Sequence, residues 1–274
     1  MTLTPLSELL ARRIVGPRDV QFDIPDDWLQ GRTSFGGLVS MYAVQAMRDV
    51  AAAQWPPEVT LRALQTNFIA PVEAGPLAVA VQVLREGRNV RQVQAQVMQR
   101  GELCALMVGV FGSDRASRLA PILPTRPPAA KPVDAIEPAP FLPGRRPNFT
   151  AHLDMRWAEG APPFSHQPAT RASIHLRLLD ADAKSLPPEL MTVLMADAFP
   201  TPVLAQFDQP VPASSVSWAL ELRPLSPPEA LDGWWRADST AVAMEGGYVN
   251  QQAMLWAPSG ALAALAYQVV TIYG

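Results

Sequence analysis

The chain alternates between one helical pattern of apolar residues and several strand patterns. Residues 34–53 (SFGGLVSMYAVQAMRDVAAA) contain no proline and place Leu38, Met41, Tyr42 and Ala46 at helical spacing, which predicts one buried helix. The segments that follow are rich in Val or alternate between apolar and polar residues, and turn sequences such as EAGP, EGRN and RGE separate them. They predict antiparallel strands at residues 61–70, 77–86, 89–99 and 103–111.

The second half of the chain repeats this order of elements. Residues 185–199 (SLPPELMTVLMADAF) predict a helix with Ser185 as its N-cap and prolines in its first turn. Strands are expected after it at residues 214–223, 233–243, 246–257 and 261–273, and the last of these is apolar enough for the middle of a sheet. A buried helix followed by an antiparallel meander, twice in one chain, predicts an α+β fold in which a sheet wraps around a helix in each copy.

The two halves also share short stretches of sequence. VQAQVMQ (93–99) aligns with VNQQAML (249–255) at an offset of 249 − 93 = 156. GELCALMVGVFG (101–112) aligns with GALAALAYQVVT (260–271) at an offset of 260 − 101 = 159. Such a match indicates either an internal repeat or chance similarity between two hairpins rich in Ala and Val.

A proline-rich segment separates the halves. Nine of the 29 prolines lie between Pro121 and Pro147, and a chain that lacks so many amide donors cannot form a helix or a central strand. We therefore expect a first module at residues 1–115, a linker at 116–147 and a second module at 148–274.

Composition excludes several classes of function. The net charge is −3 and the 22 Lys and Arg residues form no basic block, so a nucleic-acid partner is not expected. The N-terminus does not resemble a signal peptide and no apolar run approaches the roughly 18 residues of a membrane span, so we expect a cytoplasmic protein without a membrane partner. Cys104, the single cysteine, lies in an apolar run and is expected in the core. Nucleotide and dinucleotide binding are not expected, because G-x-G-x-x-G and the phosphate loop are absent. We expect neither a cofactor nor a metal.

Asp197 stands in an unusual place. Eight of the ten residues from Leu190 to Phe199 are apolar, and an isolated ionised carboxylate in such surroundings is costly, so it must be paired, protonated or catalytic. The alternative is a helix-end residue that bonds local backbone before Pro200.

Gln268 raises the same question on a strand. Alternation puts its amide on an apolar face, where it must find a partner. At the matching position the first half has Gly109 (109 + 159 = 268). A structural glutamine that bonds an edge backbone is the alternative.

Four segments resemble those of the double-hotdog acyl-CoA thioesterases, the thioesterase II-like family. They are FGG (35–37), NFIAPVEAGPLAVAVQVLREGRNV (67–90), LMADAFPTP (194–202) and ALAALAYQ (261–268). The resemblance covers nearly the whole chain apart from the proline-rich linker. It implies two hotdog modules in one chain, hydrolysis of acyl-CoA thioesters in fatty acid metabolism, and a homo-oligomer.

The resemblance also implies three catalytic positions. The family's acid on the second helix matches Asp197, and its glutamine on the last strand matches Gln268. The family's Thr or Ser falls on Ser215, with Ser214 and Ser217 as competing choices. Simple alternation along that strand would place Ser215 on the face opposite Val216 and Trp218.

Thioester hydrolysis suits such a site. A thiol has a pKa of about 8.5 and leaves readily, so a general acid is dispensable. Desolvation would raise the pKa of Asp197 toward the range of a useful base. Gln268 could then accept from the attacking water with its carbonyl oxygen and donate to Asp197 with its amide nitrogen.

Two further groups are candidates for substrate binding. Gly36 and Gly37 open the first helix, where free N–H groups could stabilise an oxyanion, although tight helix packing would also require glycine. Arg85, Arg88 and Arg91 could meet the phosphates of coenzyme A, with Arg88 the main candidate, or they could simply be a solvated hairpin tip.

Other enzyme classes fit less well. A hydratase of the same fold would need an Asp and His pair, but His152, His166 and His175 lie outside the expected catalytic helix. A serine hydrolase of the α/β type would need G-x-S-x-G, which is absent. A non-catalytic acyl-CoA or acyl-lipid binding protein of the same fold remains the alternative function.

Overall fold

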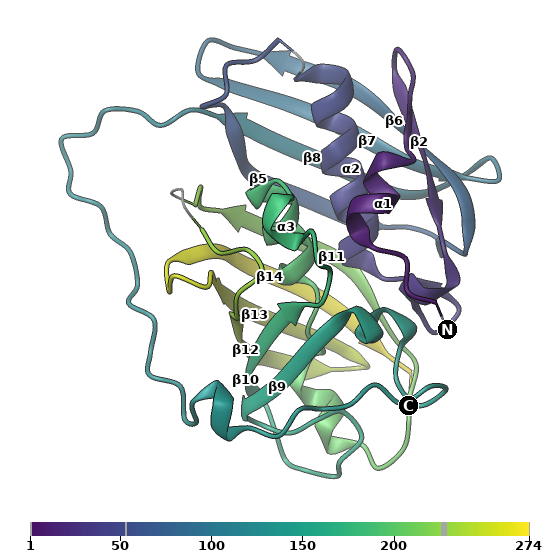
Figure 1. Ribbon diagram of the computed structural model, residues 1–274, viewed down its shortest axis with the longest axis vertical. Coiled ribbons are helices and arrows are strands. Elements are labelled where there is room, and N and C mark those ends of the chain that lie inside the picture. Colours follow the sequence, from purple (N-terminus) through teal and green to yellow (C-terminus); the bar gives the residue numbers. More distant parts are fainter. Residues whose placement is uncertain (1, 53, 226–228, 274) are drawn as a thin grey trace.

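One antiparallel sheet runs through the whole molecule. The computed structural model describes residues 2–52, 54–225 and 229–273, and Figure 1 shows them. Twelve strands follow one another in the sheet in the order β1-β2-β6-β7-β8-β5-β11-β14-β13-β12-β10-β9. The bounds of the eight expected strands are β5 Thr60–Phe68, β6 Gly75–Glu86, β7 Val90–Gln99, β8 Glu102–Gly112, β11 Ala213–Leu222, β12 Trp235–Glu245, β13 Tyr248–Trp256 and β14 Leu262–Ile272. All eight correspond to segments predicted as strands because they are rich in Val or alternate between apolar and polar residues.

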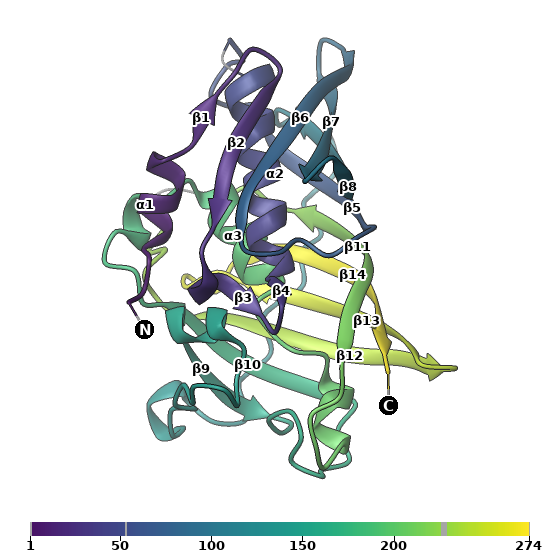
Figure 2. The ribbon, with the colours of Figure 1, turned by 90° about the vertical axis from the view of Figure 1, so that its right-hand side faces the viewer.

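Two helices lie against the sheet, one for each half of the chain. Helix α2 (Gly36–Ala51) and helix α3 (Pro188–Ala196) match the two expected helices. Figure 2 shows α3 beside the end of α2 at which that helix begins. Seven of the nine residues of α3 are buried, so packing rather than helix propensity stabilises this short element. Among the described helices, none has the length and apolarity required to cross a bilayer.

Each half also contains elements that the sequence patterns did not predict. Helix α1 (Leu6–Ala11) and strands β1 (Ile14–Val15) and β2 (Asp19–Ile24) precede α2, and β2 pairs with β6. Strands β9 (Leu153–Glu159) and β10 (Arg171–Leu178) precede α3, and β10 pairs with β12. A small second sheet pairs β3 (Leu29–Gln30) with β4 (Thr33–Ser34). The expectation of a helix packed against an antiparallel sheet in each half is confirmed. Helix α1 is an addition in the first half, and β1, β2, β9 and β10 extend the two ends of the large sheet.

The start of α3 differs from the expectation. Pro187 is the N-cap, and no side chain caps the helix. Ser185 lies in a 3₁₀ turn (Ala183–Ser185), where its hydroxyl donates to the carbonyl of Asp182. The predicted N-cap at Ser185 is therefore wrong. Two consecutive prolines, Pro187 and Pro188, delay the first turn, because proline fits the first helical position and disfavours helical backbone in the residue before it.

The proline-rich segment contains little regular structure. Between β8 and β9 the described chain has only the 3₁₀ turns Val133–Ala135 and Asn148–His152, and Figure 1 shows this segment swinging out beside the sheet. Part of this segment contacts the second half of the chain. Arg156 on β9 donates to the carbonyl oxygens of Val133 and Ile136 at 3.1 and 3.3 Å. We keep the proposed boundaries of the linker at residues 116–147.

The two halves are joined through β5 and β11, which pair antiparallel from Ala63↔Glu221 to Ser217↔Asn67. An ion pair between Arg48 of α2 and Glu189 of α3 connects the helices, and Glu189 also accepts from the backbone amide of Leu61 at 3.2 Å. Both halves therefore contribute to one continuous core.

The strand pairing refines the internal repeat. Gly101 and Gly260 both adopt positive φ, at 82° and 89°, so the two hairpin turns correspond at the offset of 159. Val97 pairs with Ala105, and Leu255 pairs with Ala264. These pairs relate β7 to β13 at an offset of 255 − 97 = 158 rather than 156. A shift of two residues leaves every side chain on the same face, because strand side chains alternate with a period of two.

Candidate active site

Asp197 lies at the point where α3 ends. It is the C-cap residue, with φ −114° and ψ 0°, and its amide donates to the carbonyl oxygen of Leu194 at 3.4 Å. Its chain neighbours Ala196 and Ala198 are 3% and 1% exposed, whereas Asp197 itself is only partly buried. The apolar run that forms α3 therefore delivers a carboxylate to the edge of the core.

The structure brings Asp197 and Gln268 together. The amide nitrogen Nε2 of Gln268 donates to Oδ1 of Asp197 at 2.9 Å and to the hydroxyl oxygen of Ser215 at 2.8 Å. Gln268 lies on β14 and is 7% exposed, so its amide finds side-chain partners on the apolar face, as a buried polar group must. Three side chains from α3, β14 and β11 thus form one hydrogen-bonded group.

Ser215 reaches this group because of a β-bulge. Ser215 pairs with Val270, whereas Ser217 pairs with Val269 and Trp218 with Gln268. Two residues on β11 therefore oppose one on β14 between Ser215 and Ser217, which turns Ser215 toward the face of Gln268. Val216 is the extra residue and is 38% exposed. The expectation that Ser215 and Trp218 lie on opposite faces of the strand is wrong, because simple alternation does not hold across a bulge.

Burial changes the acidity of Asp197. Desolvation raises its pKa from the ordinary value of 3.8 to about 7, although the hydrogen bond from Gln268 and the backbone amide of Gly37 lower it. Burial is the larger effect because the charged form is less well solvated there than in water, while two donors recover only part of that loss. A carboxyl group with such a pKa can gain and lose a proton near neutral pH.

Two glycines bring the start of α2 against this carboxylate. A Cβ atom at Gly36 would lie 2.8 Å from Oδ2 of Asp197 and 3.1 Å from the ring of Phe68. A Cβ atom at Gly37 would overlap the ring of Phe35 and lie 3.0 Å from the carbonyl oxygen of Leu194. Only glycine permits this approach. Since no side chain caps α2, its first N–H groups and the positive end of its dipole face the acid.

Gln251 is a member of the group that sequence reasoning missed. Its Nε2 atom donates to the carbonyl oxygen of Gln268 at 2.6 Å, and Gln251 itself is 3% exposed. The Gln268 carbonyl oxygen, expected to accept from water, accepts from Gln251 instead. The sequence did contain a signal for Gln251. It lies two positions from the apolar residues Val249 and Ala253 along the strand, so it shares their inward face.

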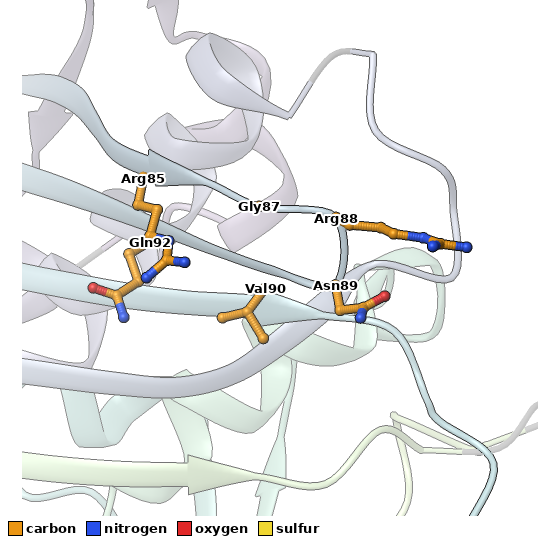
Figure 3. A pocket seen from close by; sticks show the side chains of 6 residues that line it. All are labelled: Arg85, Gly87, Arg88, Asn89, Val90 and Gln92. Atoms are coloured by element: carbon orange, nitrogen blue, oxygen red, sulfur yellow. The ribbon is translucent and has the colours of Figure 1, made fainter.

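Arg88 is not part of this group. It lies at the tip of the β6–β7 hairpin, which lines a cavity of about 380 Å³ with Arg85 and Gln92, and Figure 3 shows its side chain pointing away from the others. The base of this tip contacts the segment that follows the last residue of α2, because Trp55 donates to Glu86 at 3.0 Å. Helix α2 has sixteen residues and is therefore about 24 Å long. The hairpin tip lies near the end of this helix and Asp197 lies at its start, so the two are well separated. Phosphate binding by Arg88 stays a prediction.

An Asp and His pair does exist elsewhere in the molecule. His152 and Asp27 are 5% and 4% exposed, and Nε2 of His152 lies 3.0 Å from Oδ2 of Asp27. The pair is enclosed, because His152 stacks on Trp28 with ring centroids 4.0 Å apart and the amide of Thr4 donates to Asp27. These contacts fasten the two halves together, which is a structural role.

Cys104 is buried, as expected, and burial raises the pKa of its thiol. Within residues 2–52, 54–225 and 229–273, no group of three or more His, Cys, Asp or Glu side chains is arranged to hold a metal ion.

Comparisons with known proteins place the chain in a family. Residues 24–112 match the model of the acyl-CoA thioesterase N-terminal domain, and residues 128–272 match that of the C-terminal domain. No curated protein sequence gives a significant match.

Solved structures share the fold over the full length. A hot dog protein of unknown function from Alicyclobacillus acidocaldarius is 20% identical, with a TM-score of 0.78 and 99% of each chain covered. An acyl-CoA thioesterase II from Mycobacterium marinum is 19% identical, with a TM-score of 0.71 and 97% of each chain covered. The tandem domains and the shared architecture lead to one conclusion: this chain belongs to the acyl-CoA thioesterase family and has the double hot dog fold.

Proposed function

We propose that this protein hydrolyses the thioester bond of an acyl-CoA, with Asp197, Gln268 and Ser215 as the catalytic group. The observation that carries the proposal is the single hydrogen-bonded group they form where the start of α2 meets the end of α3. A carboxylate of raised pKa that accepts from the Gln268 amide and from the backbone amide of Gly37 is suited to activate one water molecule.

In the proposed reaction Asp197 accepts a proton from water while the water oxygen bonds to the thioester carbonyl carbon. The C–S bond of the resulting tetrahedral intermediate then breaks, and the electron pair leaves with sulfur as the thiolate of coenzyme A. The proton held by Asp197 passes to the thiolate or to solvent. The products are coenzyme A and a carboxylic acid, which then loses its remaining water-derived proton to solvent and becomes a carboxylate. No histidine is needed, because a thiolate leaves without prior protonation at neutral pH.

The other members of the group have distinct roles. Gln268 donates to Oδ1 of Asp197 and so favours the ionised form that acts as base. Ser215 accepts from Gln268, which leaves its own O–H free to donate to the water or to the thioester oxygen. Gly36 and Gly37 let the positive end of α2 approach, where developing negative charge is stabilised.

The direct test is thiol release from a panel of acyl-CoAs that differ in chain length and branching. We expect turnover above the rate of spontaneous hydrolysis for at least one of them. Tight binding of acyl-CoA without thiol release would instead indicate a non-catalytic binding protein and would overturn the proposal.

The rate of hydrolysis should depend on pH through Asp197. The base is active only when ionised, and its pKa is about 7, so kcat/KM should rise from pH 5 and level off above about pH 8. The ionised fraction at pH 5 is roughly one hundredth of the plateau value, which predicts a rate about 100-fold lower there. Steady-state kinetics between pH 5 and pH 9 measure this, and a midpoint near 4 would contradict the assignment.

Replacing Gly36 by alanine should separate activity from stability. The new Cβ would press on Oδ2 of Asp197 and on Phe68, and small displacements at a reacting centre are costly, so we expect kcat/KM to fall about 10- to 100-fold. Alanine favours helix over glycine, which offsets part of the strain. Urea unfolding monitors stability, and unchanged activity would show that the carboxylate does not need this close approach.

A further inference from the structure

Gln251 has no role in the proposed reaction, although its side chain is among the most deeply buried polar ones. It is 3% exposed, lies on β13 directly opposite Gln268, and donates to that residue's carbonyl oxygen at 2.6 Å. Its own carbonyl oxygen Oε1 has no hydrogen-bond partner within the part of the chain that the structure describes. Leaving a buried carbonyl unpaired lowers stability, so a purely structural residue would be better replaced by an apolar one.

The first half of the molecule shows that the fold itself needs no polar pair here. The position matching Gln268 is Gly109, and its partner on the neighbouring strand is Val93, which is fully buried. Met47 of α2 fills the space above Gly109, because a Cβ atom there would lie 2.7 Å from its sulfur. The same sheet position is therefore built from Val and Gly in one half and from two glutamines in the other.

The direction of the hydrogen bonds follows from Asp197. An ionised carboxylate only accepts, so the group that Gln268 turns toward Asp197 must be its NH₂. The carbonyl oxygen of Gln268 then faces Gln251, which must present its own NH₂ in turn. If Gln251 were absent, the Gln268 amide could turn over and present its oxygen to the acid, which would repel the carboxylate.

We propose that Gln251 is a positioning residue, whose amide holds Gln268 in the orientation that donates to Asp197 and Ser215. It does not touch the reacting atoms and acts through Gln268 alone. This inference rests on the proposed hydrolysis for its effect on rate, but the orientation of Gln268 can also be measured without turnover.

The test compares Gln251→Met with Gln252→Met. Gln252 is the next residue on β13 and lies exposed on the opposite face, paired with Tyr267, which makes it a matched control. We expect Gln251→Met to lower kcat/KM about tenfold, with KM changed less than about twofold. Loss of a residue that orients a group at a reacting centre typically costs about 10- to 100-fold, and the expected effect is at the lower end of that range. The midpoint of its pH profile should move upward, because Asp197 loses part of a stabilising donor. Gln252→Met should match the wild type.

A double variant provides a second readout. Because Gln251 acts through Gln268, adding Gln251→Met to Gln268→Met should cause no further loss of kcat/KM. Full additivity of the two losses, or a loss of rate without any shift of the pH midpoint, would overturn the proposal and leave Gln251 a structural residue.

Titration of the Asp197 carboxyl carbon by NMR keeps the inference separate from the proposed function. Should the wild type release no thiol from any acyl-CoA, the proposed hydrolysis fails, yet a higher Asp197 pKa in Gln251→Met than in wild type and Gln252→Met would still support the positioning role. Equal pKa values in all three proteins would refute it.

Discussion

Replacing Asp197 by asparagine should lower kcat/KM for acyl-CoA hydrolysis by about 10²- to 10⁴-fold, the usual contribution of a general base. Asparagine preserves the shape of the side chain and can still accept from Gln268, but it cannot take a proton from water. Thiol release measured at pH 8, where Asp197 is ionised, gives the largest difference. Asp208→Asn, at an exposed position, is the control and should retain full activity.

The same variant should be more stable than the wild type. The folded-state pKa of about 7 lies above the ordinary value of 3.8, so the folded protein binds the Asp197 proton more tightly than the unfolded chain does. The contribution of Asp197 to stability is therefore present below about pH 4 and is lost as pH rises to about 7. Asp197→Asn lacks this loss, and its free energy of unfolding should exceed that of the wild type by about 1 to 3 kcal/mol at pH 8.

Urea unfolding at pH 4 and pH 8 measures this difference, which should be small at pH 4 and grow toward pH 8. Loss of activity with a gain in stability would show that the fold carries the acid at a cost for the sake of function. An asparagine variant that retains turnover would remove Asp197 from the mechanism, whatever its stability.

Replacing Gln268 by methionine should lower kcat/KM by about 10²- to 10³-fold, the range found when one preorganised donor is removed from a catalytic centre. In the wild type, Nε2 of Gln268 donates both to Oδ1 of Asp197 and to Ser215. Methionine matches the length of the side chain but donates no hydrogen bond to either. The pKa of Asp197 should rise further, because one of the two groups that lower it is lost.

The pH profile distinguishes this explanation from simple misfolding. In Gln268→Met the rate that remains should reach its plateau at a higher pH than in the wild type, with near-wild-type stability in urea. Gln252→Met again serves as the control on the opposite face of β13. A wild-type rate in Gln268→Met would mean that Asp197 activates water without this partner.

Taken together, these variants test a division of labour between the halves of the chain. The second half supplies the acid, the hydroxyl and both glutamines, whereas the first half supplies the start of α2 and Phe68 beside it. The corresponding face of the first half is closed by Met47 over Gly109. In the proposed mechanism one catalytic group therefore serves the chain, and both halves contribute to its surroundings.

The sequence by itself determined the local elements and two members of the site. The patterns of apolar residues located α2, α3 and eight of the strands, because hydrophobic periodicity reflects which face of an element is buried. It also singled out Asp197 and Gln268, since a polar side chain in an apolar run requires a partner. Strands β1, β2, β9 and β10 were not predicted. They are the two outermost strands at each end of the sheet, and β1 is only two residues long, which is too short to give a periodic pattern.

Only the tertiary structure decided how these pieces meet. The bulge at Val216 turns Ser215 toward Gln268, and no pattern along one strand reveals a bulge, because it depends on pairing with another strand. The contact between Asp197 and Gln268 joins residues 71 positions apart, and the raised pKa of Asp197 follows from the burial that this packing creates. Sequence periodicity reports what each element buries, whereas distances, orientations and acidities depend on the neighbours that folding supplies.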